Sequence, residues 1–150
     1  MTLEILINND IKAAMFAKDK RKLEALRAIK AELLLLKTGK DMSSGEIPET
    51  LELKLLQKLV KQRKESAIIY KEQNRSDLEE AELYQANIIE NYLPTQLSLE
   101  EVEEIVAQVV KETGAATMKD MGKVMGTASA KLEGKADNKT ISGIVKKLLS

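Results

Sequence analysis

The residues of this chain best suited to binding a charged ligand are lysines beside a glycine-containing segment, residues 118–126. Gly122, Gly126 and Ala130 recur every four residues, so in a helix they form one smooth strip. Each glycine costs a helix about 1 kcal/mol relative to alanine, so some gain must offset it. The strip favours either close packing against another helix or a ridge that a nucleic-acid backbone can approach. The nearby lysines are Lys119, Lys123 and Lys131.

The connection that follows, residues 132–139, is a second candidate anion site. Lys135 and Lys139 flank a predicted helix–turn–helix connection, and the free amides at the start of a helix attract anions. Asp137 is placed to cap the same amides, which would repel a phosphate. The pattern therefore favours a phosphate site and a well-capped turn equally.

The composition excludes most catalytic and metal-binding chemistry. The 150 residues include no Cys and no His, which removes thiol nucleophiles, imidazole bases and most transition-metal sites. No phosphate-binding glycine loop and no Gly-x-Ser-x-Gly motif is present. Adjacent carboxylates such as Glu103 and Glu104 point about 100° apart on a helix, so they form no dyad. We expect no catalytic residue, metal or cofactor, and we interpret Met118, Met121 and Met125 as core residues.

The charges are balanced overall but unevenly distributed. The chain has 24 basic and 24 acidic residues, which argues against a surface wrapped in nucleic acid. The net charges are +4 over residues 1–40, −4 over 41–96, −4 over 97–116 and +4 over 117–150. In the first basic region, four cations surround a predicted helical corner, and we interpret them as a soluble turn rather than a phosphate site. They are Lys18, Lys20, Arg21 and Lys22.

Apolar residues three and four positions apart predict a helix over residues 3–15 and a second helix that Asp19 caps and Gly39 ends. The leucine run 33–36 predicts that the second helix is buried on more than one side. Residues 39–47 form a polar loop.

A long helix follows the loop and acts as a spine. Pro48 suits its first turn, and a helix over residues 48–73 would be roughly 39 Å long with two apolar stripes. Ser76 and Glu79 predict a capping box for a fourth helix. Pro94 ends that helix, so we place the boundary between two modules there, giving residues 1–94 and 95–150.

Three short helices are predicted in the C-terminal module. Ser98 and Glu101 form a capping box for the first, and Gly114 ends it. The further helix boundaries are predicted at Thr117, Gly134 and Asp137. The sequence thus predicts an all-α protein, with an N-terminal four-helix module containing the spine helix and a C-terminal three-helix bundle.

The hydropathy pattern predicts a cytoplasmic protein without a membrane partner. No segment has the roughly 18 consecutive apolar residues that span a bilayer. The first ten residues have no basic stretch before their apolar residues, which is unlike a signal peptide.

Four short motifs occur in order along nearly the whole chain. They are Lys61-Gln62-Arg63-Lys64-Glu65-Ser66, Tyr92-Leu93-Pro94-Thr95-Gln96-Leu97-Ser98, Lys119-Asp120-Met121-Gly122-Lys123-Val124-Met125 and Gly134-Lys135-Ala136-Asp137. Together they make the chain resemble the YqeY-like family, whose C-terminal half is homologous to the tail domain of the GatB subunit of tRNA-dependent amidotransferases. That family often has Gly-Arg-Ala-Asp-Gly in its last motif. Here Lys135 and Asn138 replace the Arg and the second Gly, which weakens any bidentate phosphate contact.

The resemblance implies a tRNA-related role, because the amidotransferase tail helps to hold tRNA. A family-level label of carbon–nitrogen ligase with glutamine as amido-N-donor follows by homology. The catalytic sites of that enzyme lie in other domains and subunits, so we expect binding of tRNA or another structured RNA without catalysis. The expected contact residues are Lys119, Gly122, Lys123, Gly126, Lys131, Lys135 and Lys139.

A protein-interaction or scaffold function through the long third helix is the alternative. Its two apolar stripes could pair with a partner or with a second copy of the chain, and an amidotransferase or another tRNA-related protein is a possible partner. The sequence leaves the oligomeric state open.

Overall fold

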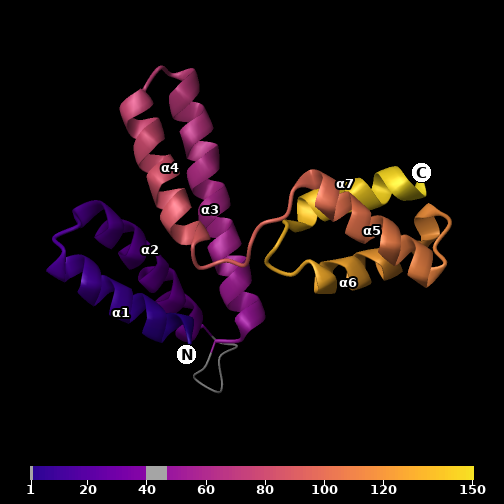
Figure 1. Ribbon diagram of the computed structural model, residues 1–150, viewed down its shortest axis with the longest axis horizontal. Coiled ribbons are helices and arrows are strands. Elements are labelled where there is room, and N and C mark those ends of the chain that lie inside the picture. The colour runs from indigo at the N-terminus through magenta and orange to yellow at the C-terminus, as the bar shows by residue number, and fades with distance from the viewer. Residues whose placement is uncertain (1, 40–46) are drawn as a thin grey trace. The chain divides into compact units, whose positions relative to one another are not determined.

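The computed structural model describes residues 2–39 and 47–150, and every regular element in these ranges is a helix (Figure 1). The predicted all-α class is confirmed. The chain divides into two compact units, unit 1 (Met1–Leu93) and unit 2 (Pro94–Ser150). Most of the predicted polar loop, residues 40–46, lies outside the described residues. In the described ranges, no helix is long and apolar enough to cross a bilayer.

Unit 1 consists of two helical hairpins. α1 (Leu3–Phe16) pairs with α2 (Lys20–Lys37), and α3 (Glu49–Glu72) pairs with α4 (Ser76–Glu90). The 24 residues of α3 make a helix of roughly 36 Å. The hairpins pack together through α2, which contacts both α3 and α4.

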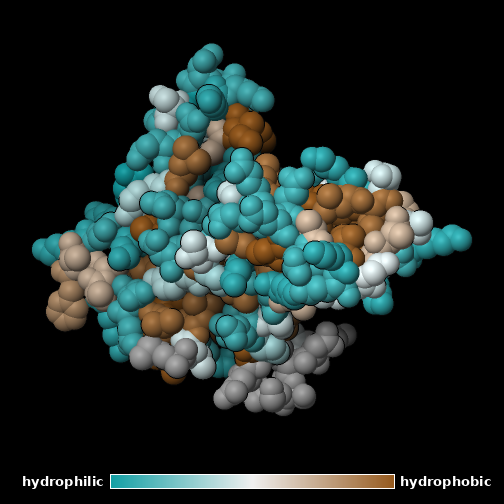
Figure 2. All heavy atoms as spheres, turned by 45° about the vertical axis from the view of Figure 1, so that its right-hand side comes forward, coloured by the Kyte–Doolittle hydropathy of each residue, from teal (hydrophilic) through white to brown (hydrophobic). Residues whose placement is uncertain are grey.

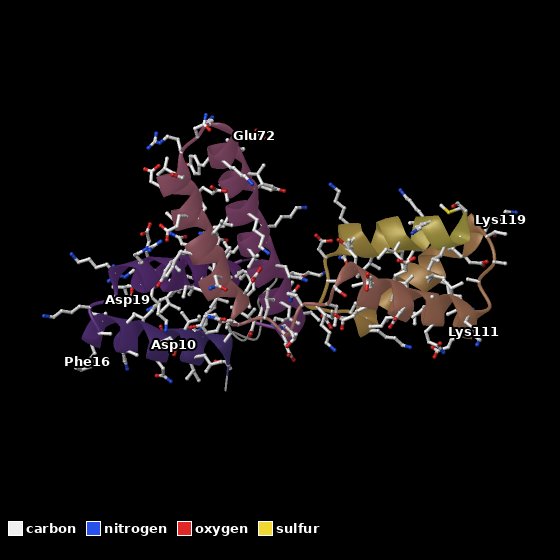
Figure 3. The ribbon with its side chains drawn as sticks, turned by 45° about the horizontal axis from the view of Figure 1, so that its top comes forward. Asp10, Phe16, Asp19, Glu72, Lys111 and Lys119 are labelled. Carbon is white, nitrogen blue, oxygen red and sulfur yellow. The ribbon has the colours of Figure 1, made fainter. Side chains whose placement is uncertain are left out.

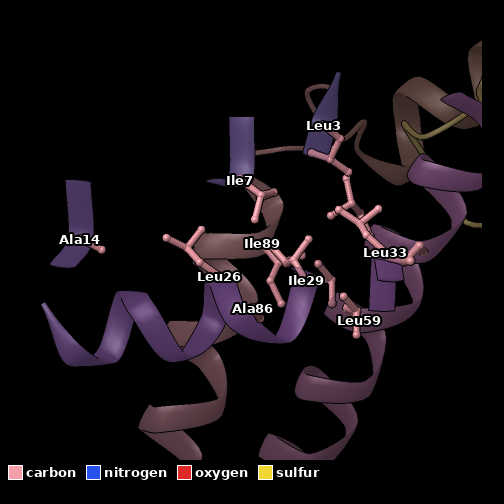
Figure 4. Close-up of a cluster of buried hydrophobic side chains, with 12 residues drawn as sticks. Leu3, Ile7, Ala14, Leu26, Ile29, Leu33, Leu59, Ala86 and Ile89 are labelled. Atoms are coloured by element: carbon pink, nitrogen blue, oxygen red, sulfur yellow. The ribbon is translucent and has the colours of Figure 1, made fainter. Parts of the chain in front are cut away.

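All four helices contribute to the core of unit 1. Ile7 of α1, Leu26 and Ile29 of α2 and Ile89 of α4 are completely buried and face one another (Figure 4). Both predicted apolar stripes of α3 contribute buried residues. The buried residues of α3 are Leu55, Leu56, Leu59, Val60 and Ala67. A single broad apolar face of α3 therefore packs inside the unit.

The leucine run in α2 does not behave as predicted. Leu33 is 3% exposed, whereas Leu34 is 49% and Leu35 is 65% exposed. The prediction of burial on several sides was wrong, because α2 has packed neighbours on one face only. Unit 1 carries nine of the eleven exposed large apolar side chains among the described residues, and Figure 2 shows such apolar surface between hydrophilic side chains. The nine are Ile5, Leu6, Met15, Phe16, Leu34, Leu35, Ile68, Ile69 and Leu83.

The helix starts of unit 1 follow the predicted caps in one case and not in another. Asp19 caps α2, with its carboxylate accepting from the backbone N–H of Lys22 at 3.1 Å, as predicted. The predicted capping box at Ser76 was wrong, since Ser76 is already helical and the cap residue Arg75 makes no side-chain cap bond. The chain turns into α4 through Asn74, which has a left-handed φ of 57°.

Polar contacts tie the helices of unit 1 together. The Arg63 guanidinium donates to the Gln85 amide oxygen at 3.3 Å, and Lys64 forms an ion pair with Glu90 at 2.6 Å. These bonds join α3 to α4 through residues of the first of the four motifs, Lys61–Ser66. The Tyr92 hydroxyl donates to the Asp10 carboxylate, joining the segment after α4 to α1.

Unit 2 is a three-helix arrangement. α5 (Leu99–Thr113) is followed by the short 3₁₀ turn η1 (Met118–Asp120), α6 (Met121–Lys131) and α7 (Asn138–Leu149), and the three long helices contact one another. Its core is built mainly from small branched side chains. The buried residues are Val102, Val106, Val109, Val124, Ala128, Leu132, Ile141, Val145 and Leu149.

The predicted boundaries of unit 2 agree with the structure at three positions. Ser98 and Glu101 form the predicted reciprocal capping box, with bonds of 3.1 and 3.2 Å. Gly114 ends α5 in the left-handed region at φ 68°, where glycine is the least strained residue. Asp137 caps α7 by accepting from the N–H of Thr140 at 2.7 Å. Contacts between residues a few positions apart thus set these helix ends of unit 2.

Candidate nucleic-acid interface

The turn before α6 is held by one carboxylate. Asp120 accepts from the N–H groups of Ala116 at 3.0 Å and Thr117 at 3.3 Å. These backbone hydrogen bonds hold the pKa of Asp120 below its ordinary value, the bond to Ala116 being the largest cause. The turn places Lys119 in η1, directly before the first turn of α6. The position of Lys119 is therefore set by an ordered backbone.

The glycine strip of α6 faces open space. Val124 and Ala128 are fully buried on the core side of the helix, and Gly122, Gly126 and Ala130 are all exposed. A Cβ atom built on Gly122 or Gly126 would meet nothing within 4 Å. The interpretation as a close helix–helix contact is therefore wrong for both glycines in this unit. What the structure shows is an open ridge whose backbone a ligand can reach.

The methionines of this segment divide between core and surface. Met121 and Met125 pack against the core of unit 2, as predicted, because they lie on the same side of α6 as Val124 and Ala128. Met118 is 44% exposed, so its interpretation as a core residue was wrong. It belongs to η1, which precedes the buried face of α6.

Lys119 and Lys123 stand beside the ridge. Both side chains are exposed, and no ion pair is found for either in the part of the chain that the structure describes. Lys119 projects near one end of the unit (Figure 3). At 100° per residue, Lys123 falls between Ala130 and Thr127 on the side of α6 away from the core. These two cations are available to a polyanion that approaches the ridge.

Lys131 is engaged elsewhere. Its ammonium group forms an ion pair with Glu112 of α5 at 3.0 Å. The hydrogen bond from Lys131 is the largest cause that lowers the pKa of the Glu112 carboxyl. Lys131 therefore points toward α5, and its charge is already balanced by a neighbour.

The turn after α6 is pinned to the segment before α5. The amide of Gln96 donates to the Gly134 carbonyl at 2.6 Å, and the N–H of Leu97 donates to the Lys135 carbonyl at 3.0 Å. Gly134 has a left-handed φ of 75°. Two of the motifs that define the family resemblance are therefore joined by hydrogen bonds. Lys135 has an exposed side chain on a backbone held at both its N–H and its carbonyl.

The start of α7 is closed to an anion by its own cap. The Asp137 carboxylate occupies the position that a phosphate would take, since it accepts from Thr140. Of the two interpretations that the sequence left equal, the structure shows the capped turn. Lys139 lies in the first turn of α7 with an exposed side chain. It can contact a phosphate only as a side-chain cation.

The outer face of α7 was missed by sequence reasoning. Gly143, Lys146 and Lys147 are exposed on the side away from Ile141 and Val145, and Lys139 lies on the same side. A Cβ on Gly143 would meet nothing within 4 Å. Lys147 makes only a long contact with Glu103 at 3.5 Å. The helical spacing of 139, 143 and 146, which resembles that of 119, 122 and 126, was the available signal.

Acidic and basic side chains of unit 2 lie on different helices. The helix α5 contains five glutamates and a single lysine. The region from residue 117 to 150 contains seven lysines and three acidic residues, and two of those carboxylates, Asp120 and Asp137, accept backbone hydrogen bonds. One helix of the bundle is thus acidic, and the other two present basic outer faces. Such a separation is typical of a surface that binds a polyanion through its backbone.

The described residues show no site for metal chemistry, since no group of three or more potential ligands is close enough to hold an ion. Unit 2 contains no Phe, Tyr or Trp, so it offers no aromatic platform for unstacked bases. What the arrangement can do is bind an extended array of phosphates.

A family model described as Yqey-like protein matches residues 5–149. The chain belongs to the YqeY-like family. It is 31% identical over 137 residues to a protein of Meyerozyma guilliermondii named Altered inheritance of mitochondria protein 41, mitochondrial, covering 85% of this chain and 70% of that one. It is 30% identical over 133 residues to a protein of the same name from Pyrenophora tritici-repentis, covering 85% and 69%. The YqeY-like match includes both units, and the names of these relatives describe no catalytic activity.

Proposed function

We propose that this YqeY-like protein is a non-catalytic accessory module that binds tRNA or a related structured RNA through the outer faces of α6 and α7. The observation that carries the proposal is an open glycine ridge on α6 with Lys119 and Lys123 beside it, neither of which forms an ion pair with a described residue. Phosphate contacts from lysines supply affinity without reading sequence. The resemblance to the GatB tail domain supports tRNA as the RNA.

The lysines contribute unequally in this proposal. Lys119, Lys123 and Lys139 are the main contacts, and Lys135 adds charge from the ordered turn. Lys131 contributes little, because binding would have to break or share its ion pair with Glu112. The mode of binding is shape-dependent, since an A-form helix is recognised through its phosphates and 2′-hydroxyl groups.

The test is fluorescence anisotropy with labelled bulk tRNA at low and moderate salt. Reversing both charges with Lys119→Glu and Lys123→Glu should weaken binding at least about tenfold and flatten its salt dependence, because each lost phosphate contact removes about 0.7 to 0.9 from the slope. The matched control is Lys54→Glu with Lys58→Glu, two exposed lysines of α3 in unit 1. Equal affinity of both double variants and the parent chain would refute the proposed site.

The proposal assigns no catalysis to the chain. A label of carbon–nitrogen ligase belongs, in this view, to the larger enzymes with which the family shares a domain. Purified protein should therefore give no glutamine-dependent amidation of charged tRNA. Product formation above a boiled-protein control would overturn the non-enzyme part. A cytoplasmic location belongs to the same proposal, although the relatives carry mitochondrial names, and cell fractionation tests it.

A scaffold function through α3 is the second candidate. Ile68 and Ile69 are 57% and 53% exposed near its C-terminal end, so a small apolar surface is left for a protein partner or a second copy. Sedimentation velocity distinguishes these cases. A concentration-dependent increase in mass that Ile68→Ser with Ile69→Ser abolishes would support self-association through α3.

A further inference from the structure

The corner between α1 and α2 carries an exposed apolar tip. Residues 13–17 read Ala-Ala-Met-Phe-Ala and contain no charged or hydrogen-bonding side chain. Phe16 is 91% exposed, more than any other large apolar residue described, and Met15 is 56% exposed. Figure 3 shows Phe16 at the end of α1, away from the other helices. The one phenylalanine of the chain therefore contributes nothing to the core.

Ile5 is a second exposed apolar residue on the outer side of α1. Ile7 and Ala14 face the core, whereas Ile5 is 48% exposed. Ile5 and Phe16 are eleven residues apart, which places them about 20° from each other around the helix at 3.6 residues per turn. Asn9 and Lys12 lie between them on the same side, so the apolar surface at the corner is confined to residues 13–17.

Cations surround this tip. Lys12, Lys18 and Lys20 are exposed, and none of them forms an ion pair with a described residue. Lys18 adopts a left-handed φ of 57°, a position where glycine or asparagine is less strained. The nearest carboxylate in sequence, that of Asp19, is occupied by the cap bond to Lys22.

Arg21, another cation of the corner, is already engaged. Arg21 forms an ion pair with Glu80 at 2.9 Å, and its guanidinium lies 4.1 Å from the centre of the Tyr84 ring. Glu24, one turn into α2, is the remaining exposed acidic residue beside the corner. The corner thus combines an apolar tip with three uncommitted ammonium groups.

We infer that this basic corner (Lys12, Met15, Phe16, Lys18 and Lys20) docks on the surface of an anionic lipid bilayer. Phe16 and Met15 would enter the boundary between headgroups and acyl chains, and the ammonium groups would contact lipid phosphates. Charge complementarity selects the anionic surface, and the aromatic tip gives the attachment its apolar part. Docking of this kind needs no spanning segment, and it departs from the sequence-based prediction of no membrane partner.

A lipid surface suits the tip better than a nucleic acid does. A base that is recognised specifically stacks on an aromatic ring and is also hydrogen-bonded along its edges. Here the ring is flanked by Met15, Ala13 and Ala17, all exposed and without polar atoms in their side chains. An exposed apolar tip with three exposed lysines beside it in the sequence matches a headgroup layer on both counts.

The first test is co-sedimentation with vesicles of phosphatidylcholine alone or mixed with phosphatidylglycerol. The parent chain should bind the mixed vesicles, release them at high salt and leave the neutral ones free. Phe16→Ser should weaken binding about tenfold. Lys12→Glu, Lys18→Glu and Lys20→Glu together should weaken it about a hundredfold. Ile68→Ser, a similarly exposed apolar residue on α3, is the matched control and should bind like the parent.

A single tryptophan gives a second readout. The chain contains no Trp, so Phe16→Trp introduces one reporter at the tip and Ile68→Trp one on α3. Fluorescence of the first variant should shift to the blue and resist aqueous quenchers only with anionic vesicles, whereas the second should not respond. Because Phe16 is exposed, circular dichroism and thermal unfolding should be unchanged in its variants.

The outcomes separate this inference from the RNA proposal. Lys119→Glu with Lys123→Glu should retain vesicle binding, and Phe16→Ser should retain tRNA binding. Equal vesicle binding by the parent and Phe16→Ser, with no fluorescence shift in the Phe16→Trp variant, would overturn the inference. Loss of tRNA binding in Phe16→Ser without any vesicle effect would do so too, and it would assign the tip to base stacking.

Discussion

Both units bury an aliphatic core, but they expose different kinds of side chain. Unit 1 buries Leu and Ile between two hairpins but leaves nine large apolar side chains exposed, whereas unit 2 buries Val, Ile and Leu and leaves two. Unit 2 instead separates charge, with an acidic α5 and basic outer faces on α6 and α7. In our proposals, the exposed apolar side chains of unit 1 meet a lipid surface and the basic faces of unit 2 meet RNA.

The helix starts of the two units are alike, but their turns differ. Each unit begins two helices with side-chain caps, at Thr2 and Asp19 in unit 1 and at Ser98 and Asp137 in unit 2, and unit 2 ends α5 with a glycine in the left-handed region. In unit 1, both corners instead place a non-glycine residue there, Lys18 and Asn74. A strained lysine beside an exposed phenylalanine is a costly combination for stability alone. It is consistent with a corner whose surface has a function.

The largest effect that distinguishes the units should come from a cavity in one core. Leu132 is fully buried in unit 2, so Leu132→Ala should lower the free energy of unfolding by about 3 kcal/mol, enough to unfold a unit of this size. Hydrogen exchange should show loss of protection in unit 2 while α1 to α4 stay protected. Equal loss in both units would mean that they unfold as one cooperative body.

A smaller loss should follow from breaking the bond between Tyr92 and Asp10 in unit 1. Tyr92→Phe removes a hydrogen bond to a charged acceptor, so we expect a loss of about 1.5 to 3 kcal/mol. Burial, followed by the hydrogen bond to Asp10, raises the pKa of the Tyr92 hydroxyl above its ordinary value of 10.0. The folded state therefore favours the protonated phenol.

That raised pKa fixes the pH range of the effect. The contribution of Tyr92 is fully present below the pKa of an unfolded tyrosine, about 10, and is lost as the pH rises above it. Urea unfolding of the parent and of Tyr92→Phe between pH 8 and pH 11, taken as about two units below and one above that pKa, should show the two curves converging at the alkaline end. If the free energies of unfolding of the parent and of Tyr92→Phe differed by the same amount at every pH, the raised pKa of Tyr92 would not be the cause.

Substitution of the glycines of unit 2 should raise the free energy of unfolding, whereas the two preceding substitutions lower it. Gly122→Ala and Gly126→Ala should each stabilise unit 2 by about 1 kcal/mol, because the added methyl meets nothing and the helix gains propensity. The same pair should weaken tRNA binding a few-fold by keeping phosphates away from the ridge. Thermal unfolding and anisotropy measure the two effects, and a stabilised variant with unchanged affinity would show that the ridge takes no part in binding.

The smallest effect should be at Lys131. Lys131→Gln should change tRNA affinity less than about twofold, because the Lys131 charge is already balanced by Glu112. Lys123→Gln should change it several-fold. Loss of the Lys131–Glu112 pair should have little effect on stability, since surface ion pairs contribute little. Anisotropy at one moderate salt concentration is sufficient. Equal losses for the two variants would mean that the ion pair opens readily for RNA.

Sequence reasoning reached the fold through local signals and failed where burial depends on neighbours. Apolar periodicity predicted the helices, and Asp19, the Ser98–Glu101 box and Gly114 were read correctly because a cap is a contact between residues a few positions apart. The exposure of Leu34 and Leu35 could not be read in this way. Whether a leucine is covered depends on how many helices pack around it, and that is a long-range property.

For the candidate site, too, the sequence predicted local features and missed those that depend on packing. The sequence identified the lysines and the glycine strip, but it could not choose between a packed strip and an open one, or see that Lys131 pairs with Glu112. It also missed the face formed by Gly143 and Lys146.

The sequence by itself determined the helical class, the break at Pro94, the absence of Cys and His chemistry, and the two basic regions, because composition, backbone restriction and residue spacing are local properties. The tertiary structure decided which apolar and basic groups are left facing outward. Helix packing buries one side of each helix and so selects its free face, and this is why the glycine ridge of α6 and the Phe16 tip of α1 became visible only in three dimensions.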